Sequence, residues 1–452
     1  MVFKGKKIIV LGAGISGISV AHVLQQEGAQ VCLSDSKKRE DITNDLSCLL
    51  DVGVDLKLGN QSNDVLEGMD YMVISPGISI NAPIVKKAQE NGIAVMSEVE
   101  VAFNLAKAPI LAVTGTNGKT TTTTLLGELL KHTGKKVLVG GNIGMALSAE
   151  AKSADKDDLI VAEISSFQLE GVIEFRPHIA AVLNITPDHI DRHGTLENYK
   201  LAKEKIFAKQ TNEDFLVLNY DDLKVREMAN ESAGKVMFFS TKQVLPEGIY
   251  LENDNLVANY CGVKNVICHK DELQIKGEHN IQNAMAACAF GVILGIGVDA
   301  MSLTLREFKS VEHRIEFVDV INEVEYYNDS KATNPESAIK ALEAFAGGVI
   351  LVAGGHDKMT DLTDFMEAIK NKVSCLILIG EATVRFKENA EKYGVDNIYC
   401  ATSMEDAVKY AHSIAKYPQA VVLSPACSSY DMFKNYEERG TIFKNLVKSL
   451  KN

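Results

Sequence analysis

Short apolar runs alternate with amphipathic stretches along the whole chain. The runs at 8–11 and 110–114, for example, are each followed by a segment whose apolar residues recur at helical spacing. Strands buried in a parallel sheet read as continuous apolar runs, and the helices that connect them carry one apolar face. The pattern therefore predicts an α/β protein built on parallel sheets.

The alternation falls into three blocks, and each block opens on its own apolar strand. We place the limits of the blocks at 1–98, 99–311 and 312–452. Because a chain of 452 residues is too long for one hydrophobic core, we expect one domain per block. The predicted strands lie at 8–11, 31–34, 71–75, 110–114, 136–139, 158–164, 179–184, 215–219, 348–353, 375–379, 397–400 and 420–423.

The second block contains one interruption of this pattern. Between 241 and 275, short apolar pieces separated by Pro, Gly and Asn predict a small antiparallel addition, and 280–294 then reads as a helix. The rest of the block predicts a doubly wound parallel sheet. The third block predicts a second, smaller nucleotide-fold-like domain.

Composition narrows the class of protein. Apolar residues make up 46% of the chain and charged residues 24%, as in globular proteins. With 60 acidic and 47 basic residues the net charge is −13, which argues against a nucleic-acid-binding surface. We expect no transmembrane segment, since the apolar runs fall short of the roughly 20 residues that cross a bilayer. The stretch 8–24 mimics a signal peptide, but its three glycines favour a strand, a turn and a helix.

The eight cysteines indicate neither a zinc site nor a disulfide framework, because none of them forms a Cys-x-x-Cys pair. Cys261, Cys268 and His269 are close in sequence but offer too few ligands for a metal. We expect these three side chains in or beside a surface hairpin. A reducing cytoplasm is the expected compartment.

A glycine loop follows the apolar strand 110–114 and leads into a helical pattern. Its glycines, Gly115 and Gly118, let successive backbone N–H groups face phosphate oxygens at the positive end of the next helix. Lys119 adds a mobile charge, and Thr120 a hydroxyl suited to Mg²⁺. We interpret the loop as a nucleoside triphosphate site, although Val113 occupies a glycine position of the common consensus. A glycine turn at a sheet edge is the alternative.

A second glycine motif follows the first strand of the chain. Gly12, Gly14 and Gly17 have the spacing that lets a diphosphate approach a helix N-terminus, and Asp35 ends the next strand. A UDP-sugar and a dinucleotide both suit this spacing, as does a purely structural tight turn. Nothing elsewhere suggests hydride chemistry, so a nicotinamide cofactor is disfavoured.

Polar side chains follow two strands of the second block. Glu163 ends one apolar strand at the sheet edge where a Mg²⁺ ligand is needed, with Ser165 and Gln168 close behind it. His189 follows the next strand and reaches the same edge. A neutral His189 binds a second metal, whereas a protonated one neutralises a phosphate. An acid that merely marks a strand end and a surface histidine are the alternatives.

Further candidates lie on a helix and in three loops. Lys203 falls on an apparent helix, where a lysine is ordinarily solvated, and its spacing suggests no other role. The segments 329–335 and 354–358 each follow a third-block strand and concentrate hydroxyls and cations, so they indicate either a polar ligand pocket or solvated loops. Cys427, within 424–435, is expected to pack, because nothing indicates an activated thiolate.

Taken together, these motifs resemble the Mur ligases, and among them the D-glutamate-adding group. The resemblance extends over essentially the whole chain. The alanine-adding ligases typically have His where Asn117 stands, and the folylpolyglutamate synthases lack the glycine-rich first domain. Segments similar to the ligases in general lie at 115–121, 141–144, 163–170, 280, 283 and 313–314, and the group is indicated by 329–334 and 424–435.

The resemblance implies a three-domain α/β fold. A Rossmann-like N-terminal domain (1–98) would bind the UDP-substrate, a central P-loop ATPase-like doubly wound domain (99–311) ATP, and a Rossmann-like C-terminal domain (312–452) the amino acid. The implied reaction is ATP-dependent addition of D-glutamate to UDP-N-acetylmuramoyl-L-alanine through an acyl phosphate, a cytoplasmic step of bacterial peptidoglycan precursor synthesis. Two Mg²⁺ sites and a monomer that binds no nucleic acid are expected.

The resemblance also implies roles for individual residues, and it alone suggests that Lys203 is carbamylated. The implied catalytic residues are Lys119, Glu163, His189 and Lys203, and the implied metal ligands are Thr120, Glu163, His189 and Lys203. ATP contacts fall on Gly115, Thr116, Asn117, Gly118, Lys119, Thr120, Thr121, Asn280, Asn283, Arg314, Asp329 and Lys331. UDP-substrate contacts fall on Ser16, Asp35, Ser36, Ser75, Gly77, Asn142, Ser165 and Gln168. D-glutamate contacts fall on Thr333, Lys358, Ser429, Tyr430 and Tyr436.

Two alternatives stay open at this point. One is another Mur ligase that adds a different amino acid. The other is a nucleotide-sugar-binding regulator without turnover, which the first block alone would suggest. The combination of Lys119, Glu163, His189 and Lys203 exceeds what binding alone requires and favours a ligase.

Overall fold

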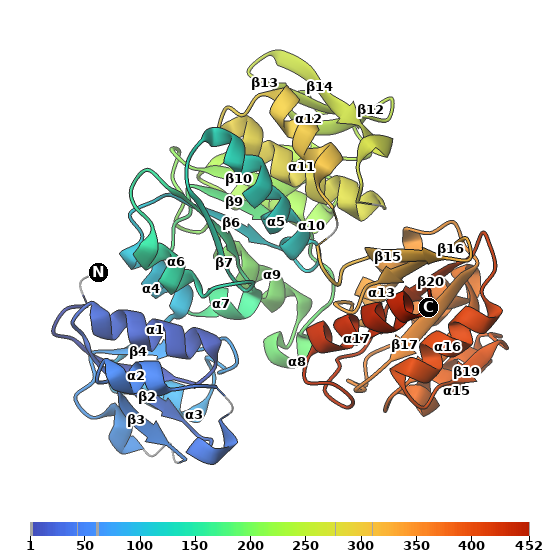
Figure 1. Ribbon diagram of the computed structural model, residues 1–452. Helices are drawn as coiled ribbons and strands as arrows, with labels where there is room; N and C mark the ends of the chain where they lie inside the picture. Colours follow the sequence, from blue (N-terminus) through green and yellow to red (C-terminus); the bar gives the residue numbers. More distant parts are fainter. Residues whose placement is uncertain (1–2, 43, 60–62, 276, 310, 452) are drawn as a thin grey trace. The chain divides into compact units, whose positions relative to one another are not determined.

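The computed structural model describes residues 3–42, 44–59, 63–275, 277–309 and 311–451 (Figure 1). The chain divides into two compact units. One comprises Met1–Glu272 with Gln282–Arg306, and the other Leu273–Ile281 with Glu307–Asn452. The first unit carries two sheets and the second unit one.

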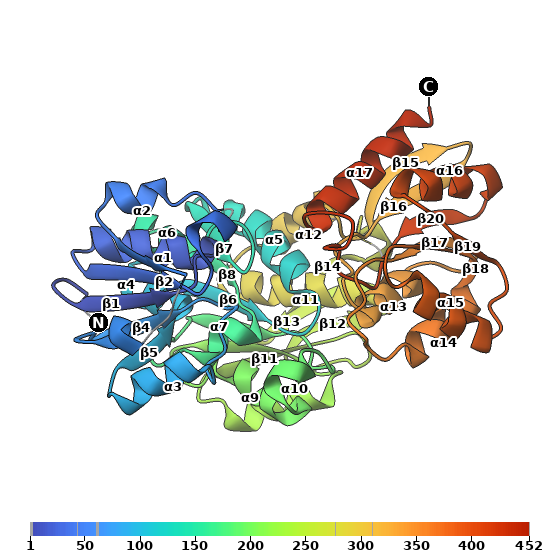
Figure 2. The same ribbon diagram turned by 90° about the horizontal axis from the view of Figure 1, so that it is seen from below.

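The first sheet is parallel, with strand order β3-β2-β1-β4-β5. Apolar side chains of β1 alternate between two clusters, so that α1 and α2 cover one face and α3 covers the other (Figure 2). Such two-sided cover explains why these strands read as continuous apolar runs. The elements are β1 (Lys7–Leu11), α1 (Ile15–Gln26), β2 (Gln30–Asp35), η1 (Arg39–Asp41), α2 (Ser47–Asp51), β3 (Asp55–Leu58), η2 (Asn63–Leu66), β4 (Tyr71–Ile74), α3 (Pro83–Glu90) and β5 (Ala94–Ser97).

Helix α4 (Glu98–Leu105) follows this sheet and is fastened to the second sheet's domain. The buried carboxylate of Glu100 accepts backbone N–H bonds from Ile173 (2.8 Å) and Phe175 (3.0 Å). Beside it, the Ser97 N–H donates to the carbonyl oxygen of Gly171 at 2.8 Å. The junction near residue 98 is therefore held by specific backbone bonds.

The second sheet has the order β14-β13-β12-β11-β10-β9-β6-β8-β7. It is parallel from β7 to β12 and antiparallel through β13 and β14, so the predicted doubly wound sheet and its antiparallel addition are both confirmed. The strands are β6 (Ile110–Thr114), β7 (Val137–Gly141), β8 (Leu159–Glu163), β9 (Ile179–Val182), β10 (Phe215–Asn219), β11 (Lys235–Ser240), β12 (Gly248–Glu252), β13 (Asn255–Tyr260) and β14 (Val263–His269).

Helices cover both faces of the second sheet. Figure 2 shows α9 and α10 on one side, where α4, α6 and α7 also pack, and α5 and α11 on the other. The helices are α5 (Lys119–Leu130), η3 (Lys131–Thr133), α6 (Leu147–Ser153), α7 (Ser166–Glu170), α8 (Ile190–His193), α9 (Leu196–Glu204), α10 (Leu223–Glu227), η4 (Met228–Glu231), η5 (Lys270–Glu272), α11 (Glu278–Ile293) and α12 (Val298–Glu307).

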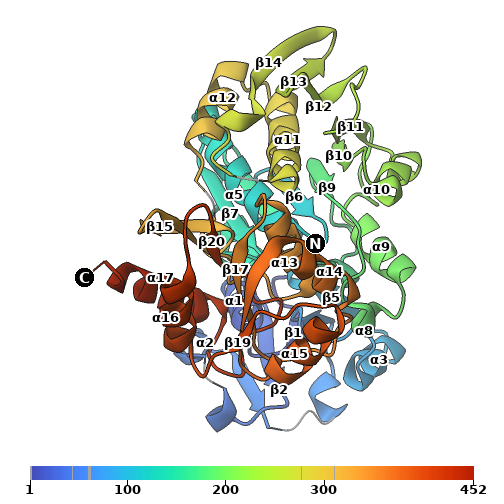
Figure 3. The same ribbon diagram turned by 90° about the vertical axis from the view of Figure 1, so that its right-hand side faces the viewer.

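The third sheet has the order β15-β16-β20-β17-β18-β19 and is parallel except for the β15–β16 hairpin. Helices α16 and α17 pack on one face, and α13, α14 and α15 on the other (Figure 3). The elements are β15 (Glu316–Ile321), β16 (Val324–Asn328), α13 (Pro335–Glu343), β17 (Val349–Gly354), α14 (Thr363–Lys372), β18 (Val373–Ile379), α15 (Thr383–Lys392), β19 (Ile398–Cys400), α16 (Met404–Ile414), β20 (Ala420–Leu423) and α17 (Tyr436–Ser449).

The predicted α/β class and every predicted strand are confirmed, but β3, β5, β11 and the β15–β16 hairpin were not predicted. The block limits at 98 and 311 stay predictions. Cys261, Cys268 and His269 lie on or beside the β13–β14 hairpin, as expected. Among the described residues, no helix is long and apolar enough to span a membrane.

Candidate functional site

The loop between β6 and α5 is fixed by the strand next to it. The Thr116 N–H donates to the carbonyl oxygen of Asn184 at 3.0 Å. The Asn184 side chain also accepts the Asn117 N–H (2.8 Å) and donates to the Asn117 carbonyl oxygen (3.0 Å). This pairing fixes the loop at the N-terminus of α5, where backbone N–H groups and the helix dipole attract anions.

Gly118 is the residue at which the loop turns into α5. Its φ of 85° lies in the left-handed region, which side chains rarely adopt. A Cβ atom at this position would also overlap the Oδ1 atom of Asn283, on α11. The phosphate loop and the predicted ATP contact Asn283 are therefore packed directly against each other.

The Lys119 side chain folds back over the loop. Its Nζ atom donates to the carbonyl oxygens of Gly115 (2.9 Å) and Thr116 (2.6 Å). Thr120 and Thr121, the next two residues of α5, are buried. The predicted order of glycine, lysine and hydroxyl groups is thus assembled around one helix N-terminus.

Glu163 lies beside this loop, because β8 pairs with β6 and sets Glu163 opposite Val113. One carboxylate oxygen accepts a 2.8 Å bond from the Asn142 side chain. The other, Oε2, is buried and has no hydrogen-bond partner among the described residues. A carboxylate oxygen and a hydroxyl are hard oxygen donors, so the buried Glu163 and the buried Thr120 at the start of α5 fit Mg²⁺.

Lys203 differs most from expectation. A solvated helix lysine was predicted from its spacing, yet its side chain is only 1% exposed. It reaches across to the phosphate loop, where Nζ donates to the Gly115 carbonyl oxygen (2.8 Å) and the Thr114 hydroxyl (3.3 Å). Burial, and then the charge of Lys119, lower the pKa of Lys203 well below its usual value, while Asp188 and Glu163 oppose this shift.

His189 lies in the loop between β9 and α8 and is half-exposed. Its backbone has a φ of 53°. Its ring meets Phe167 edge-on, with 4.7 Å between ring centroids, and its Nε2 atom lies 3.4 Å from an Asp188 carboxylate oxygen. The residue is accessible to a ligand and oriented by two neighbours, as a metal ligand needs to be.

Ser165 and Gln168 bind each other at the start of α7. The Gln168 N–H donates to the Ser165 hydroxyl (3.3 Å), and the Ser165 N–H donates to Gln168 Oε1 (2.9 Å). This reciprocal capping box fixes the helix start directly after Glu163 and Ile164. The two side chains therefore have a structural task in addition to the predicted substrate contact.

The glycine motif of the first domain closes around Gly12. A Cβ atom at Gly17 would overlap the Gly12 carbonyl oxygen, so only glycine fits there. That carbonyl accepts a 3.2 Å bond from the Ser75 hydroxyl. Asp35 accepts the Ala13 N–H at 2.7 Å. The predicted UDP residues Ser16, Asp35, Ser36, Ser75 and Gly77 thus follow or end β1, β2 and β4 at one edge of the sheet.

In the second unit, Asp329 is fully buried at the carboxyl end of β16. It accepts bonds from the Ser424 hydroxyl (2.7 Å) and the Ile315 N–H (3.1 Å). Burial raises its pKa to about 7, although the charges of Arg314 and Arg439 partly oppose the shift. Near neutral pH this carboxyl is poised between its two protonation states.

Four predicted D-glutamate residues, Thr333, Lys358, Ser429 and Tyr430, lie in loops of this unit, and the fifth, Tyr436, begins α17. The Lys358 ammonium donates to the Thr333 carbonyl oxygen at 3.2 Å, and Lys331 lies over the Tyr436 ring at 5.6 Å. Ser429 is buried, whereas Tyr430 is 74% exposed. Thr333 thus contacts Lys358, and Tyr436 contacts Lys331. No described contact connects Tyr430 to these residues.

Four residues that support these sites were not predicted. Asn184 and Tyr199 hold the phosphate loop, since the Tyr199 hydroxyl donates to Thr116 Oγ1 at 3.3 Å. Arg439 is fully buried and donates to the carbonyl oxygens of Ser330 (2.7 Å) and Cys427 (3.1 Å). The fourth is Arg192, whose guanidinium donates to both carboxylate oxygens of Glu170. Their spacing gives no signal, because each acts across a long sequence separation.

Cys427 packs as predicted. It is buried, and burial raises the pKa of its thiol to about 12, so the group stays protonated near neutral pH. A protonated thiol is a poor nucleophile. The thiol is therefore not an activated nucleophile.

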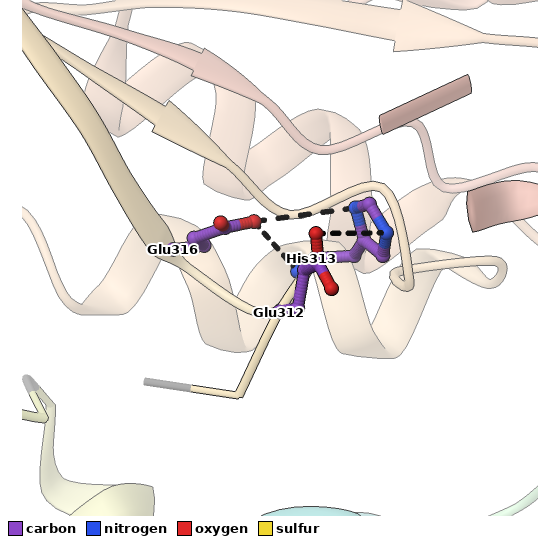
Figure 4. A group of neighbouring side chains, drawn as sticks. All are labelled: Glu312, His313 and Glu316. Carbon is purple, nitrogen blue, oxygen red and sulfur yellow. Dashed lines mark hydrogen bonds and ion pairs between the residues drawn. The ribbon is translucent and has the colours of Figure 1, made fainter. Parts of the chain in front are cut away.

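A cluster of Glu312, His313 and Glu316 brings together groups that bind metals in other proteins (Figure 4). Lys444 forms ion pairs with both carboxylates. The ring of His313 lies 2.9 Å from the Asn328 side chain, and burial lowers its pKa. Because Lys444 already pairs with both carboxylates, we assign no metal to this cluster.

Family models match three successive parts of the chain. Residues 6–97 match the Mur ligase MurD-like N-terminal domain, 113–291 the Mur ligase middle domain, and 313–427 the Mur ligase glutamate ligase domain. Together these matches span all three sheets.

Two full-length relatives carry the same name. The chain is 46% identical to the UDP-N-acetylmuramoylalanine--D-glutamate ligase of Thermoanaerobacter sp. (strain X514), with all of both chains covered. It is 47% identical, with the same coverage, to the ligase of that name from Caldanaerobacter subterraneus subsp. tengcongensis. The compared region covers the positions of all the sites described above.

Solved structures share the fold at low sequence identity. A pseudomurein peptide ligase type C from Methanothermus fervidus has a TM-score of 0.61 at 19% identity, covering 99% of this chain and all of the other. The UDP-N-acetylmuramate-alanine ligase MurC from Thermotoga maritima also has a TM-score of 0.61 at 19% identity, with 98% and 99% covered.

Proposed function

The chain belongs to the Mur ligases and, within them, to the UDP-N-acetylmuramoylalanine--D-glutamate ligases, and from this premise we propose the reaction and the roles of its residues. The enzyme is an ATP-dependent ligase that joins D-glutamate to UDP-N-acetylmuramoyl-L-alanine by an amide bond. This is a step of peptidoglycan precursor synthesis. We place it in the bacterial cytoplasm, where ATP is available. The observation that carries the proposal is the full-length similarity to ligases of this name.

The reaction has two steps. The alanyl carboxylate attacks the γ-phosphorus of ATP, so that a carboxyl-oxygen–phosphorus bond forms and ADP leaves. The neutral amine of D-glutamate then attacks the acyl carbon, phosphate leaves with its bridging oxygen, and the nitrogen loses a proton. Because two anions must meet in the first step, the site needs concentrated positive charge.

Lys119 and the N-terminus of α5 supply that charge from the protein. In the structure the Lys119 ammonium is held 2.9 Å and 2.6 Å from two loop carbonyl oxygens, within reach of a phosphate bound in the loop. Exchange of these weak partners for phosphate oxygens would place the charge at the transferring group. Thr120 and Glu163 would hold Mg²⁺, which neutralises phosphate charge when bound.

We propose that His189 and Lys203 hold a second Mg²⁺, with Lys203 as a carbamate. Carbamylation needs a neutral amine, and burial lowers the pKa of Lys203 in that direction. The amine would attack carbon dioxide, form a nitrogen–carbon bond and release a proton. The product carries a negative charge, which suits a buried position close to Lys119.

The outer domains divide the remaining substrates in this proposal. Ser16, Asp35, Ser36, Ser75 and Gly77 bind the UDP group, and Asn142, Ser165 and Gln168 bind the muramoyl arm. Asn280, Asn283, Arg314, Asp329 and Lys331 contact ATP. Thr333, Lys358, Ser429, Tyr430 and Tyr436 bind D-glutamate. The rival reading, a regulator without turnover, would leave the buried Lys203 and Glu163 beside the phosphate loop without a purpose.

Isotope transfer tests the reaction. UDP-N-acetylmuramoyl-L-alanine labelled with ¹⁸O in its alanyl carboxylate is incubated with the enzyme, ATP, Mg²⁺ and D-glutamate. We expect one labelled oxygen in each released phosphate, because the acyl phosphate bridge carries it. Unlabelled phosphate would refute the acyl phosphate. Equal turnover with L-alanine and UDP-N-acetylmuramic acid would refute the assigned substrates.

A further inference from the structure

Arg192, on α8, joins three segments of the first unit that lie far apart in the sequence. Its guanidinium donates to the carbonyl oxygens of Pro76 (2.8 Å) and Ile78 (2.9 Å), in the loop after β4. It also donates to both carboxylate oxygens of Glu170, at the end of α7 (3.2 and 2.6 Å). One side chain therefore connects the first sheet's domain with two helices of the second.

The same guanidinium lies over the ring of Phe167, 4.3 Å from the ring centroid. The same ring meets the His189 ring edge-on, and the Arg192 backbone N–H donates to the His189 carbonyl oxygen at 3.1 Å. Arg192 is thus linked to His189 both through the backbone of α8 and through Phe167.

The segments that Arg192 connects carry the substrate residues of the proposed function. Ser75 and Gly77 lie in the loop whose carbonyl oxygens it binds. Ser165 and Gln168 begin the helix that Glu170 ends, and His189 immediately precedes α8. In the proposed function, the 75–78 loop holds the UDP end of the substrate, and α7 and His189 lie at its reacting end. The Arg192 side chain connects these segments to one another.

Arginine has the geometry that this connection needs. Two carbonyl oxygens and a carboxylate are bound at once by the planar fork of donors, whereas a lysine ammonium offers a single point of charge. The pair is also largely shielded, since the side chains of Arg192 and Glu170 are 14% and 11% exposed. Screening by solvent is weak there, so loss of the guanidinium leaves Glu170 poorly compensated.

We propose that Arg192 is a positioning residue for the UDP-linked substrate: it holds the 75–78 loop at a set distance from His189 and α7. It touches no reacting atom, so its effect is exerted through the residues it connects. This inference rests on the proposed function for its substrate, but the loop restraint itself does not.

The test compares Arg192→Lys and Arg192→Ala with Arg176→Ala. Arg176 forms a similar ion pair, 2.8 Å long, with the buried Asp214 of the same domain, but it contacts none of these segments in the described contacts. It therefore controls for the loss of an arginine that pairs with a buried carboxylate. We expect both Arg192 variants to raise the KM for UDP-N-acetylmuramoyl-L-alanine about tenfold, with the KM for ATP unchanged, as loss of charge-assisted hydrogen bonds predicts. Arg176→Ala should leave both constants unchanged.

Hydrogen exchange supplies a readout that needs no activity. Amide exchange in the 75–80 segment should become faster in Arg192→Lys than in the wild type, and stay unchanged in Arg176→Ala. Unchanged exchange, an unchanged KM for the UDP-substrate, or equal increases in the KM for ATP and the UDP-substrate would each overturn the inference. A wild-type enzyme that releases no phosphate would instead refute the proposed function, while the exchange result still decides the role of Arg192. Should the alanine variant fail to fold, the lysine variant carries the test.

Discussion

Side chains at the phosphate loop are oriented by partners from the loop itself and from distant parts of the chain. Lys119 is held by loop carbonyl oxygens, Glu163 by Asn142, and Lys203 by Gly115 and Thr114. Such preorganisation lowers the reorganisation needed when charge develops during phosphoryl transfer. Substitution of a single one of these side chains should therefore remove activity with little change to the fold.

Replacement of Lys119 by Ala should lower kcat at least about 100-fold, because a charge aimed at the transferring phosphate is lost. Binding of the UDP-substrate should survive, since its predicted contacts lie elsewhere. Phosphate release and calorimetric titration of the UDP-substrate measure the two effects. Lys131→Ala is the matched control, because Lys131 lies just beyond the same helix and forms an exposed ion pair with Glu128 at 2.6 Å. Near-normal turnover in Lys119→Ala would contradict the assignment.

Asp329 should make stability depend on pH. Its pKa is about 7 in the folded chain, against 3.8 for the ordinary side chain, so the folded state retains a proton that the unfolded state releases. The stabilisation from this proton is fully present below pH 3.8 and is lost as the pH rises through 7. Between pH 5 and 7 the wild type should lose about 2 kcal/mol relative to Asp329→Asn, which has no proton to release.

Urea denaturation of both full-length proteins at pH 5 and pH 7 checks this difference. The asparagine keeps one acceptor for the Ile315 N–H and a donor for Ser424, so the packing of the site is matched. Parallel pH profiles for the two proteins would show that Asp329 does not titrate in this range.

At the scale of elements, α11 packs closely against the phosphate loop because Gly118 has no side chain. Gly118→Ala should raise the KM for ATP about tenfold or more, because the new methyl group collides with Asn283 and displaces either the loop or α11. The left-handed backbone adds strain of about 1 kcal/mol. Steady-state kinetics and thermal unfolding separate the two effects.

Gly262→Ala separates strain from collision. Gly262 has a φ of 78°, close to that of Gly118, but nothing lies within 4 Å of a Cβ atom built there. It should lose similar stability and keep the wild-type KM for ATP. An equal rise of KM in both variants, or none in Gly118→Ala, would show that the contact with Asn283 does not shape the ATP site.

The elements most easily predicted were those buried on both sides. β6, β8, β9 and β17 are buried throughout and stand out as apolar runs. The unpredicted strands β3 and β15 are mostly half-exposed or exposed, so their composition is mixed. Pairing with a neighbour, not local apolar content, makes such edge segments strands.

At the scale of the whole molecule, the proposed division of substrates predicts that third-domain variants spare the first two substrates. Thr333→Ala should raise the KM for D-glutamate about tenfold, as expected when one hydrogen bond to a charged ligand is lost. The constants for ATP and the UDP-substrate should stay unchanged. Thr402→Ala, at an exposed threonine of the same domain, is the control. An unchanged KM for D-glutamate would remove Thr333 from the amino-acid site.

The sequence by itself determined the α/β class, the phosphate loop and the order of the glycine and carboxylate motifs, because these depend on local spacing and on apolar runs. Tertiary structure alone decided that Lys203 is buried beside the loop, that Asp329 holds a proton near neutral pH, and that Arg192 connects two domains. Each of these properties arises from desolvation or from partners distant in sequence. Neither leaves a trace in the spacing of neighbouring residues.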